Sequence, residues 1–170
     1  MKPLYVMLVG LPASGKSTLA REIVAQYPAA GWHMISTDDF IEVEAAKRGA
    51  SYDAVFKDVI DAATKDMNER RAYALGLHGN IIHDQTNLTV KSRARKLEGI
   101  PADYVKIGLF CDCGDMERRQ RLAARPGKAI PEDVDAAMRL SLAPISTGEF
   151  DVIAVADRYL WALDPYLAVS

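Results

Sequence analysis

The chain has 170 residues, of which 49% are hydrophobic and 26% charged, and its formal net charge is −2. This length is typical of a single domain that buries a hydrophobic core. No apolar run approaches the roughly 20 residues that a membrane-spanning helix needs, and the apolar stretch near the start leads directly into a glycine-rich motif, so we expect neither a membrane segment nor a signal peptide. The acidic balance also argues against a protein that covers a long stretch of nucleic-acid backbone.

The cysteines and histidines show no pattern of a metal site. Cys111 and Cys113 are too close together for an ordinary structural disulfide and too few for a zinc site. We expect free thiols, buried or half-buried, and therefore a reducing, cytoplasmic location. His33, His78 and His83 lie far apart in the sequence and are expected to pack or to face solvent.

Apolar runs alternate with helical patterns along the chain. Strands are predicted at residues 4–10, 32–36, 80–85, 104–111 and 151–156. This alternation predicts one α/β domain spanning residues 1–170, with a parallel sheet between layers of helices and ligands bound beyond the carboxyl ends of the strands. In the longest interval, a stripe at three- and four-residue steps is expected to face the core, and it consists of Phe56, Val59, Ile60, Ala63 and Met67.

The first predicted strand runs into Gly10-Leu-Pro-Ala-Ser-Gly15-Lys16-Ser17, which has the spacing of a phosphate-binding loop. Its two glycines let backbone N–H groups approach a phosphate closely. We expect Lys16, in a solvent-facing loop, to place its charge near the transferred phosphoryl, the Ser17 hydroxyl to bind Mg²⁺, and the following helix to direct its positive end at the anion. The expected nucleotide contacts are Gly10, Pro12, Ala13, Ser14, Gly15, Lys16, Ser17 and Thr18. A glycine-rich turn before a surface helix is the alternative.

Two aspartates follow the second predicted strand. The sequence there is Thr37-Asp38-Asp39, and parallel topology places it beside the phosphate site. One carboxylate could accept a proton from an attacking hydroxyl or position Mg²⁺. The alternative is that Thr37 or Asp38 only caps the helix that begins here.

The third predicted strand ends at Asp84, which is suited to hold Mg²⁺ directly or through water. The next residue is Gln85, so the paired acids typical of motor ATPases are missing. This favours an acceptor other than water. A simple turn aspartate is the alternative.

A cationic stretch lies in the third quarter of the chain, and its members are Arg118, Arg119, Arg121, Arg125 and Lys128. Phosphoryl transfer needs cations that close over the nucleotide, and the break at Pro126 and Gly127 could form the elbow of a lid. Arg125, where the predicted helix ends, is the best candidate. Alternatively, the arginines form a solvated face with salt bridges to Asp115 and Glu117.

Four motifs, GLPASGKST, ISTDDF, DQTNLT and RPGKAIP, occur in an order and spacing that resemble the kinase domain of the phage-type polynucleotide 5′-kinase/3′-phosphatase family, within the P-loop kinases. The resemblance covers residues 4–142 and implies a P-loop NTPase-type parallel sheet with a helical, arginine-rich lid. It implies that Lys16 and Ser17 serve ATP and Mg²⁺, that Asp38 is the general base for the acceptor hydroxyl and that Arg125 stabilises the transferring phosphate.

Further contacts are expected on both sides of this site. Arg121 is an expected nucleotide contact, and Asp39, Thr86 and Asn87 are expected substrate contacts. Two positions depart from the family, which has arginines around its Asp-Asp pair where this chain has Thr37 and Ile41. The Asp-x-Asp-Gly-Thr pattern of the phosphatase domain does not follow, so we expect the kinase half alone.

The sequence therefore predicts an ATP- and Mg²⁺-dependent kinase with a hydroxyl acceptor on DNA or RNA, where residues 91–96 and the arginine-rich helix could form a local basic surface. Three alternatives stay open. The enzyme could phosphorylate a hydroxymethyl-pyrimidine in phage DNA, or it could act on a nucleoside or another small molecule. The third alternative is a nucleotide-dependent switch, although the Asn-Lys-x-Asp guanine motif is absent from the sequence.

Overall fold

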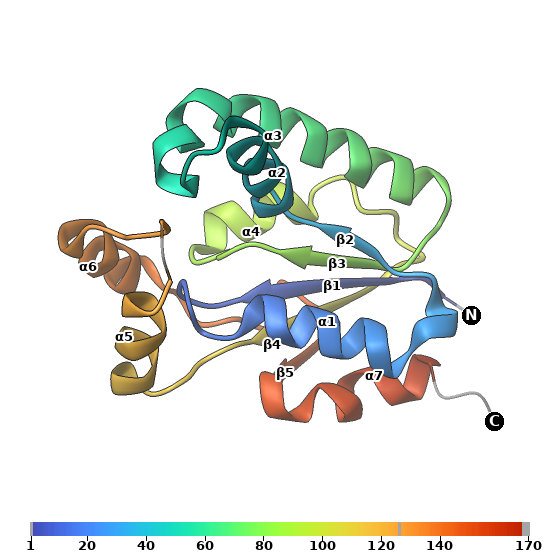
Figure 1. The fold of residues 1–170 in the computed structure, drawn as a ribbon. Helices are drawn as coiled ribbons and strands as arrows, with labels where there is room; N and C mark the ends of the chain where they lie inside the picture. The colour runs from blue at the N-terminus through green and yellow to red at the C-terminus, as the bar shows by residue number, and fades with distance from the viewer. Residues whose placement is uncertain (1, 126, 168–170) are drawn as a thin grey trace.

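A parallel five-stranded sheet forms the centre of the molecule in the computed structural model, which describes residues 2–125 and 127–167 (Figure 1). The strand order is β2-β3-β1-β4-β5. The strands are β1 (Leu4–Val9), β2 (His33–Ile35), β3 (Ile81–Asp84), β4 (Val105–Phe110) and β5 (Val152–Val155). The predicted α/β fold is confirmed, and each predicted strand ends within one residue of the observed one.

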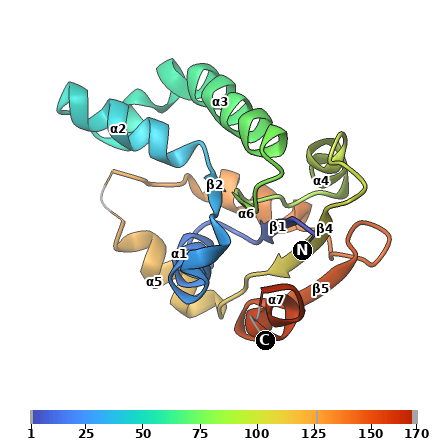
Figure 2. The ribbon, with the colours of Figure 1, turned by 90° about the vertical axis from the view of Figure 1, so that its right-hand side faces the viewer.

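Helices cover both faces of this sheet (Figures 1 and 2). Helices α1 and α7 lie on one face, α3 and α4 lie on the other with α2 packed on α3, and α5 and α6 stand beyond the carboxyl ends of the strands. Their bounds are α1 (Lys16–Gln26), α2 (Asp38–Arg48), α3 (Tyr52–Gly76), α4 (Val90–Leu97), α5 (Asp115–Ala123), α6 (Glu132–Ser141) and α7 (Tyr159–Leu167), with short 3₁₀ turns at Pro28–Ala30 and Ala156–Arg158. Among the helices of the described ranges, none is both long and apolar enough to span a bilayer.

Strand β1 lies between two hydrophobic cores. Leu4, Val6 and Leu8 pack on the side of α1 and α7, whereas the alternate residues of the strand pack on the side of α3. A central strand of a parallel sheet is buried on both faces, which explains its uninterrupted apolar sequence. The loop that follows β1 therefore starts from a strand that is buried on both faces.

The core-facing stripe of α3 differs from the prediction at one end. Val59, Ala63 and Met67 are buried as expected, but Phe56 is 38% exposed and Val55 takes its place at 3%. Helix α2 packs against α3, and the hydrophobic cluster between the two helices buries the α3 residues Val55, Val59 and Ala63, which are four residues apart. Phe56 lies about 100° further round the helix and instead contacts the ring of Tyr52.

Candidate active site

The phosphate-binding loop leaves β1 and is held from both neighbouring strands. The N–H of Gly10 donates to the carbonyl of Thr86 at 3.0 Å, and a Cβ added at Gly10 would lie 2.2 Å from the carbonyl oxygen of Cys111. Ala13 and Gly15 adopt φ values of 64° and 97°, in the left-handed region. Glycine is therefore required at position 10 by close approach and favoured at position 15 by backbone conformation.

Lys16 points into this loop, and its side chain is buried although the loop was expected to face solvent. The residue is 8% exposed, and its Nζ donates to the carbonyls of Gly10 at 2.9 Å and Leu11 at 2.7 Å. Burial lowers the pKa of Lys16, while the nearby Asp84 carboxylate opposes that shift. The loop thus holds a positive charge within its own concavity.

Ser17 and Asp84 form the part of the site that fits Mg²⁺. Asp84 ends β3 and pairs in register with Leu8 of β1, which brings its buried carboxyl to the start of the loop. Burial raises the pKa of Asp84, and a hydrogen bond with Ser17 and the charge of Lys16 counteract it. In residues 2–125 and 127–167 no group of three acidic, histidine or cysteine side chains could hold a metal. One carboxylate and one hydroxyl fit an ion that takes its other ligands from phosphates and water.

Asp38, the first residue of α2, is held by two side chains from other elements. The Tyr52 hydroxyl donates to its Oδ1 at 2.8 Å, and Lys128 Nζ donates to its Oδ2 at 3.2 Å. Within the described chain, Thr37 makes no side-chain capping bond to α2 and instead accepts a bond from Gln85 Nε2 at 3.4 Å. The Asp38 carboxylate is therefore directed across the α2–α3 junction and does not cap the helix.

Asp39 is exposed and lies beside an arginine that sequence patterns do not indicate. The guanidinium of Arg70 lies 4.0 Å from Asp39 Oδ2 and donates to the carbonyl of Ser36 at 2.6 Å. We call Ser36, Asp38, Asp39, Tyr52 and Arg70 the acceptor corner. It forms where the start of α2 meets α3, and no local motif links Tyr52 or Arg70 to the aspartates.

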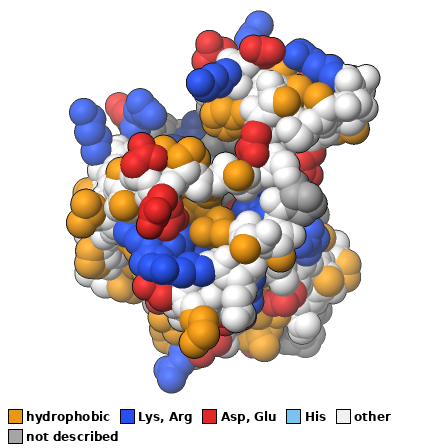
Figure 3. Space-filling model, turned by 60° about the vertical axis from the view of Figure 1, so that its left-hand side comes forward, with side chains coloured by type: hydrophobic (Ala, Val, Ile, Leu, Met, Phe, Trp, Pro, Cys, Tyr) orange, Lys and Arg blue, Asp and Glu red, His pale blue; other side chains and the backbone are white. Residues whose placement is uncertain are grey.

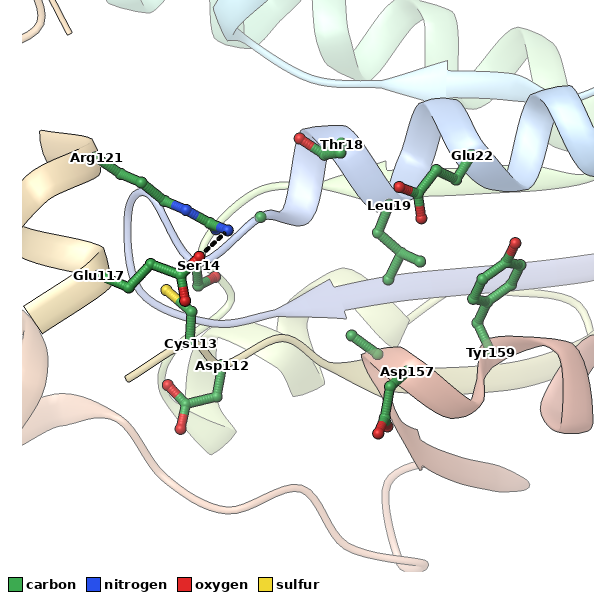
Figure 4. Close-up of a pocket in the computed structure, with 12 residues that line it drawn as sticks. Ser14, Thr18, Leu19, Glu22, Asp112, Cys113, Glu117, Arg121, Asp157 and Tyr159 are labelled. Carbon is green, nitrogen blue, oxygen red and sulfur yellow. Dashed lines mark hydrogen bonds and ion pairs between the residues drawn. The ribbon is translucent and has the colours of Figure 1, made fainter. Parts of the chain in front are cut away.

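A hollow of about 380 Å³ opens on the other side of the phosphate loop, between α1, α5 and the turn after β5 (Figure 4). Arg121 reaches over it from α5, with NH1 3.4 Å from the carbonyl of Ala13 and NH2 2.6 Å from Glu117. Thr18, Cys113 and Tyr159 also line it. The predicted nucleotide contacts Ser14, Gly15, Thr18 and Arg121 are thus brought together at one hollow.

Arg125 lines a second hollow, together with Tyr52 and Lys128. Burial is the main cause of the lowered pKa of Lys16 and the raised pKa of Tyr52, and the positive charge of Arg125 pushes both values down. Its side chain is half-buried. The neighbouring Pro126, part of the expected lid elbow, lies outside the described residues.

Two arginines of the expected cationic surfaces are structural. Arg118 is 1% exposed and makes two bonds of 2.7 Å to Asp135, which ties α5 to α6. Arg93 is fully buried and binds Glu149 through two nitrogens, together with four backbone carbonyls. The basic surface expected at residues 91–96 is correspondingly smaller, with Lys91 and Arg95 exposed.

The turn after β3 is bonded both to β1 and to the phosphate loop. Asn87 is 1% exposed, and its Nδ2 donates to the carbonyls of Leu8 at 2.7 Å and Gln85 at 3.1 Å. Thr86 is half-buried next to the phosphate loop, where its carbonyl accepts the Gly10 N–H. The structure therefore places Thr86 beside the phosphate loop, whereas the Asn87 side chain holds the turn against β1.

The two positions that lack the family's arginines have local reasons for their residues. Ile41 is fully buried in the α2–α3 cluster, and Thr37 is 8% exposed beneath Gln85. A guanidinium at position 41 would lie in an apolar core and carry the cost of an unpaired buried charge. In this chain the arginine of the corner comes from α3, as Arg70.

A family model described as AAA domain (AAA_33) matches residues 6–145, which contain the phosphate loop, both aspartate motifs and the arginine-rich helix. The chain belongs to this family. The AAA_33 domain is a P-loop kinase domain, so the chain is a phosphotransferase with a nucleotide-binding fold.

Solved structures share the fold over much or all of this chain. A candidate kinase from Chloroflexus aurantiacus is 17% identical with a TM-score of 0.72, and the match covers 98% of this chain and 100% of that one. A chain of the Pnkp1/Rnl/Hen1 RNA repair complex is 23% identical with a TM-score of 0.66, over 82% of this chain and 44% of that one. A sugar kinase from Janibacter sp. HTCC2649 is 19% identical with a TM-score of 0.60, over 99% and 98%.

Proposed function

We propose that this kinase transfers the γ-phosphoryl of ATP to a hydroxyl of a nucleic acid, in the manner of a polynucleotide 5′-hydroxyl kinase. One observation carries the proposal. The Asp38 carboxylate begins the helix that follows β2, is 45% exposed, and is held by donors from Tyr52 and Lys128, so an oriented base that a hydroxyl can reach lies beyond the carboxyl ends of the strands. A nucleotide-dependent switch has no use for a base at that place.

Each residue has a chemical role in this proposal. Lys16 and the backbone of the phosphate loop bind the phosphates, and Mg²⁺ held near Ser17 and Asp84 would neutralise charge on them. Asp38 orients the acceptor hydroxyl and takes its proton. Arg125 stabilises charge on the transferring phosphoryl. Helix α5 and the loop after it act as the lid that brings Arg125 and Arg121 onto the nucleotide.

Two features support a nucleic-acid acceptor. The related chain of similar fold belongs to an RNA repair complex. Arg70 also lies at the acceptor corner, and Lys91 and Arg95 are exposed on α4. These groups suit the binding of a few phosphates near a strand end, because a short site needs only a small number of cations.

A small-molecule acceptor is the second candidate. Ile41 and Arg93 are buried, and the face shown in Figure 3 carries acidic and basic side chains side by side. A mixed surface of this kind favours a sugar, a nucleoside or a hydroxymethylated base over a long strand. The sugar kinase of similar fold supports the same candidate.

The deciding experiment supplies γ-³²P-ATP, Mg²⁺ and a panel of acceptors. The panel contains 5′-hydroxyl DNA and RNA oligonucleotides, hydroxymethylated duplex DNA, nucleosides and sugars. We expect label on an oligonucleotide 5′ end with the wild type and with the control Lys65→Ala, whose side chain is 80% exposed, and none with Lys16→Ala. Label on a sugar or nucleoside alone would contradict the nucleic-acid acceptor. Absence of label on every acceptor would contradict the transferase proposal.

A further inference from the structure

The Asp38 carboxylate is fixed by donors from two distant segments. Tyr52, the first residue of α3, donates to Oδ1 at 2.8 Å, and Lys128, in the loop between α5 and α6, donates to Oδ2 at 3.2 Å. A carboxylate turns easily about its terminal torsion, which has a broad, roughly two-fold energy profile. Two donors on opposite oxygens select one orientation of the group.

Lys128 is itself held in place. Its Nζ donates to Glu42 Oε1 at 2.5 Å and lies 4.2 Å from the centroid of the Tyr52 ring, and its side chain is 15% exposed. An ammonium over an aromatic face gains a cation–π interaction in addition to its ion pairs. Lys128 is therefore a placed charge and not a mobile surface cation.

The loop that carries Lys128 docks on the start of α3 through its backbone. The N–H of Asp53 donates to the carbonyl of Gly127 at 2.9 Å, and the N–H of Ala129 donates to Asp53 Oδ2 at 2.8 Å. Gly127 has a φ of 70°, and a Cβ there would lie 2.8 Å from the Cβ of Ser51. Glycine thus permits an approach that a larger residue would prevent.

The state of Tyr52 suits its role as a donor. Burial and the neighbouring Asp38 carboxylate raise the pKa of Tyr52 above its ordinary value, so the phenol keeps its proton. Each carboxylate oxygen has two acceptor directions, and the Asp38 side chain is 45% exposed. The two donors leave room for an acceptor hydroxyl to bind the same carboxylate.

We infer that Tyr52 and Lys128 are positioning residues that orient Asp38 toward the acceptor hydroxyl, and that docking of the 127–129 loop couples this orientation to the segment that carries Arg125. The inference rests on the proposed function, in which Asp38 is the base. Arg125 lies two residues before Gly127 in the chain, so in this proposal one segment brings the phosphate-facing cation and the orientation of the base into place together. Misplacement of a reacting group by about 1 Å can cost on the order of 10² in rate.

The first test separates turnover from nucleotide binding. Tyr52→Phe and Lys128→Met are expected to lower kcat by about 10- to 100-fold while the KM for ATP stays within about twofold, because neither side chain touches the phosphate loop. Lys128→Arg keeps the charge and is expected to stay within about fivefold of the wild type. The control is Lys47→Met, on the exposed side of α2, which is expected to change neither value. Unchanged kcat in both Tyr52→Phe and Lys128→Met would overturn the inference.

The second test asks whether the two residues act through Asp38. In an Asp38→Ala background, Tyr52→Phe and Lys128→Met are expected to cause less than a twofold further loss, because the group that they orient is gone. Losses that multiply fully with that of Asp38→Ala would show an independent role and overturn the inference.

A third measurement does not depend on turnover. Hydrogen exchange is expected to show protected N–H groups at Asp53 and Ala129 in the wild type and faster exchange of both in Lys128→Met, with α1 unchanged. Equal exchange in the two proteins would overturn the docking part. A wild type without transferase activity but with this exchange pattern would contradict the proposed function and leave the docking supported, so the two failures are distinguishable.

Discussion

The phosphate loop and the acceptor corner are built differently. One continuous stretch, residues 10–18, forms the phosphate loop, and backbone groups hold most of it. The acceptor corner joins the starts of α2 and α3 with Arg70, and the 127–129 loop completes it through charged side chains. A backbone cradle suits phosphates that every ATP carries, whereas side-chain pairs can be exchanged to suit a different acceptor.

The largest expected effect comes from the phosphate loop. Lys16→Ala removes the charge inside the cradle, so we expect phosphoryl transfer to fall by at least about 10³-fold. The melting temperature is expected to stay within a few degrees of the wild type, because the ammonium bonds only to carbonyls and a hydroxyl of its own loop. Steady-state transfer and thermal unfolding measure the two effects. Near-normal transfer would exclude the phosphate loop as the reaction site.

Substitutions of Arg125 test whether this side chain acts on the transferring phosphoryl or on the bound acceptor. Arg125→Ala is expected to lower kcat by about 10²- to 10³-fold with a small change in the KM for ATP, because the guanidinium stabilises charge that develops during transfer. Arg125→Lys is expected to remain impaired, since an ammonium lacks the planar fork. Arg119→Ala, an exposed position on α5, is the control. If Arg125→Ala weakened only acceptor binding, Arg125 would belong to the acceptor corner alone.

Arg118 supports the segment that joins the regions. Arg118→Met leaves Asp135 with Arg139 as its remaining partner and is expected to lower the free energy of unfolding by about 2 kcal/mol, because two charge-assisted hydrogen bonds of a buried arginine are lost. Chemical denaturation measures this change. Arg121→Met, at a position where the ion pair is exposed, is expected to change stability by less than about 1 kcal/mol. Equal losses would show that Arg118 has no special structural role.

A buried histidine, His83, is linked through Gln85 to Thr37, the residue that precedes Asp38. Gln85, whose Nε2 donates to Thr37, accepts a bond from His83 Nε2 on its Oε1 at 3.1 Å, and burial, followed by the charge of Lys96, lowers the pKa of His83 to about 3. The unfolded histidine titrates near 6.5, so the stabilising effect is complete above that pH and is lost as the pH falls toward 3.

The difference between the pKa of His83 in the folded and unfolded protein predicts how steeply the free energy of unfolding depends on pH. Between pH 6 and pH 4, the free energy of unfolding is expected to fall about 1.4 kcal/mol per pH unit more steeply in the wild type than in His83→Gln. His78→Gln, at an exposed position, is expected to keep the wild-type slope. Identical slopes in all three proteins would contradict a buried, neutral His83.

The sequence predicted the parts of the site that depend on local spacing. The phosphate loop, the aspartates Asp38 and Asp84 after two of the strands and the five strands follow from patterns within a few residues, and the structure has the five strands in the expected places. Arg121, an expected nucleotide contact, also lies beside the phosphate loop. At these positions the place of the residue follows from the strand, helix or loop that carries it.

The remaining parts depend on packing between distant elements. Arg93 and Arg118 have the same sequence context as exposed arginines, and only the approach of Glu149 and Asp135 makes them structural. Tyr52 reaches Asp38 because α2 packs on α3, which also exposes Phe56 and buries Val55. No spacing rule within one segment contains that information.

The central claim is that Asp38 serves the acceptor and not the nucleotide. The most direct measurement compares Asp38→Asn with Asp39→Asn, recording the ATP dissociation constant by calorimetry and the single-turnover rate of transfer from γ-³²P-ATP to the acceptor. We expect Asp38→Asn to keep the dissociation constant within about twofold and to slow transfer by about 10²- to 10⁴-fold, as loss of a general base does. Asp39→Asn, whose carboxylate is exposed beside Arg70, is expected to change the rate by less than about tenfold. Equal, small losses in both variants would contradict the account.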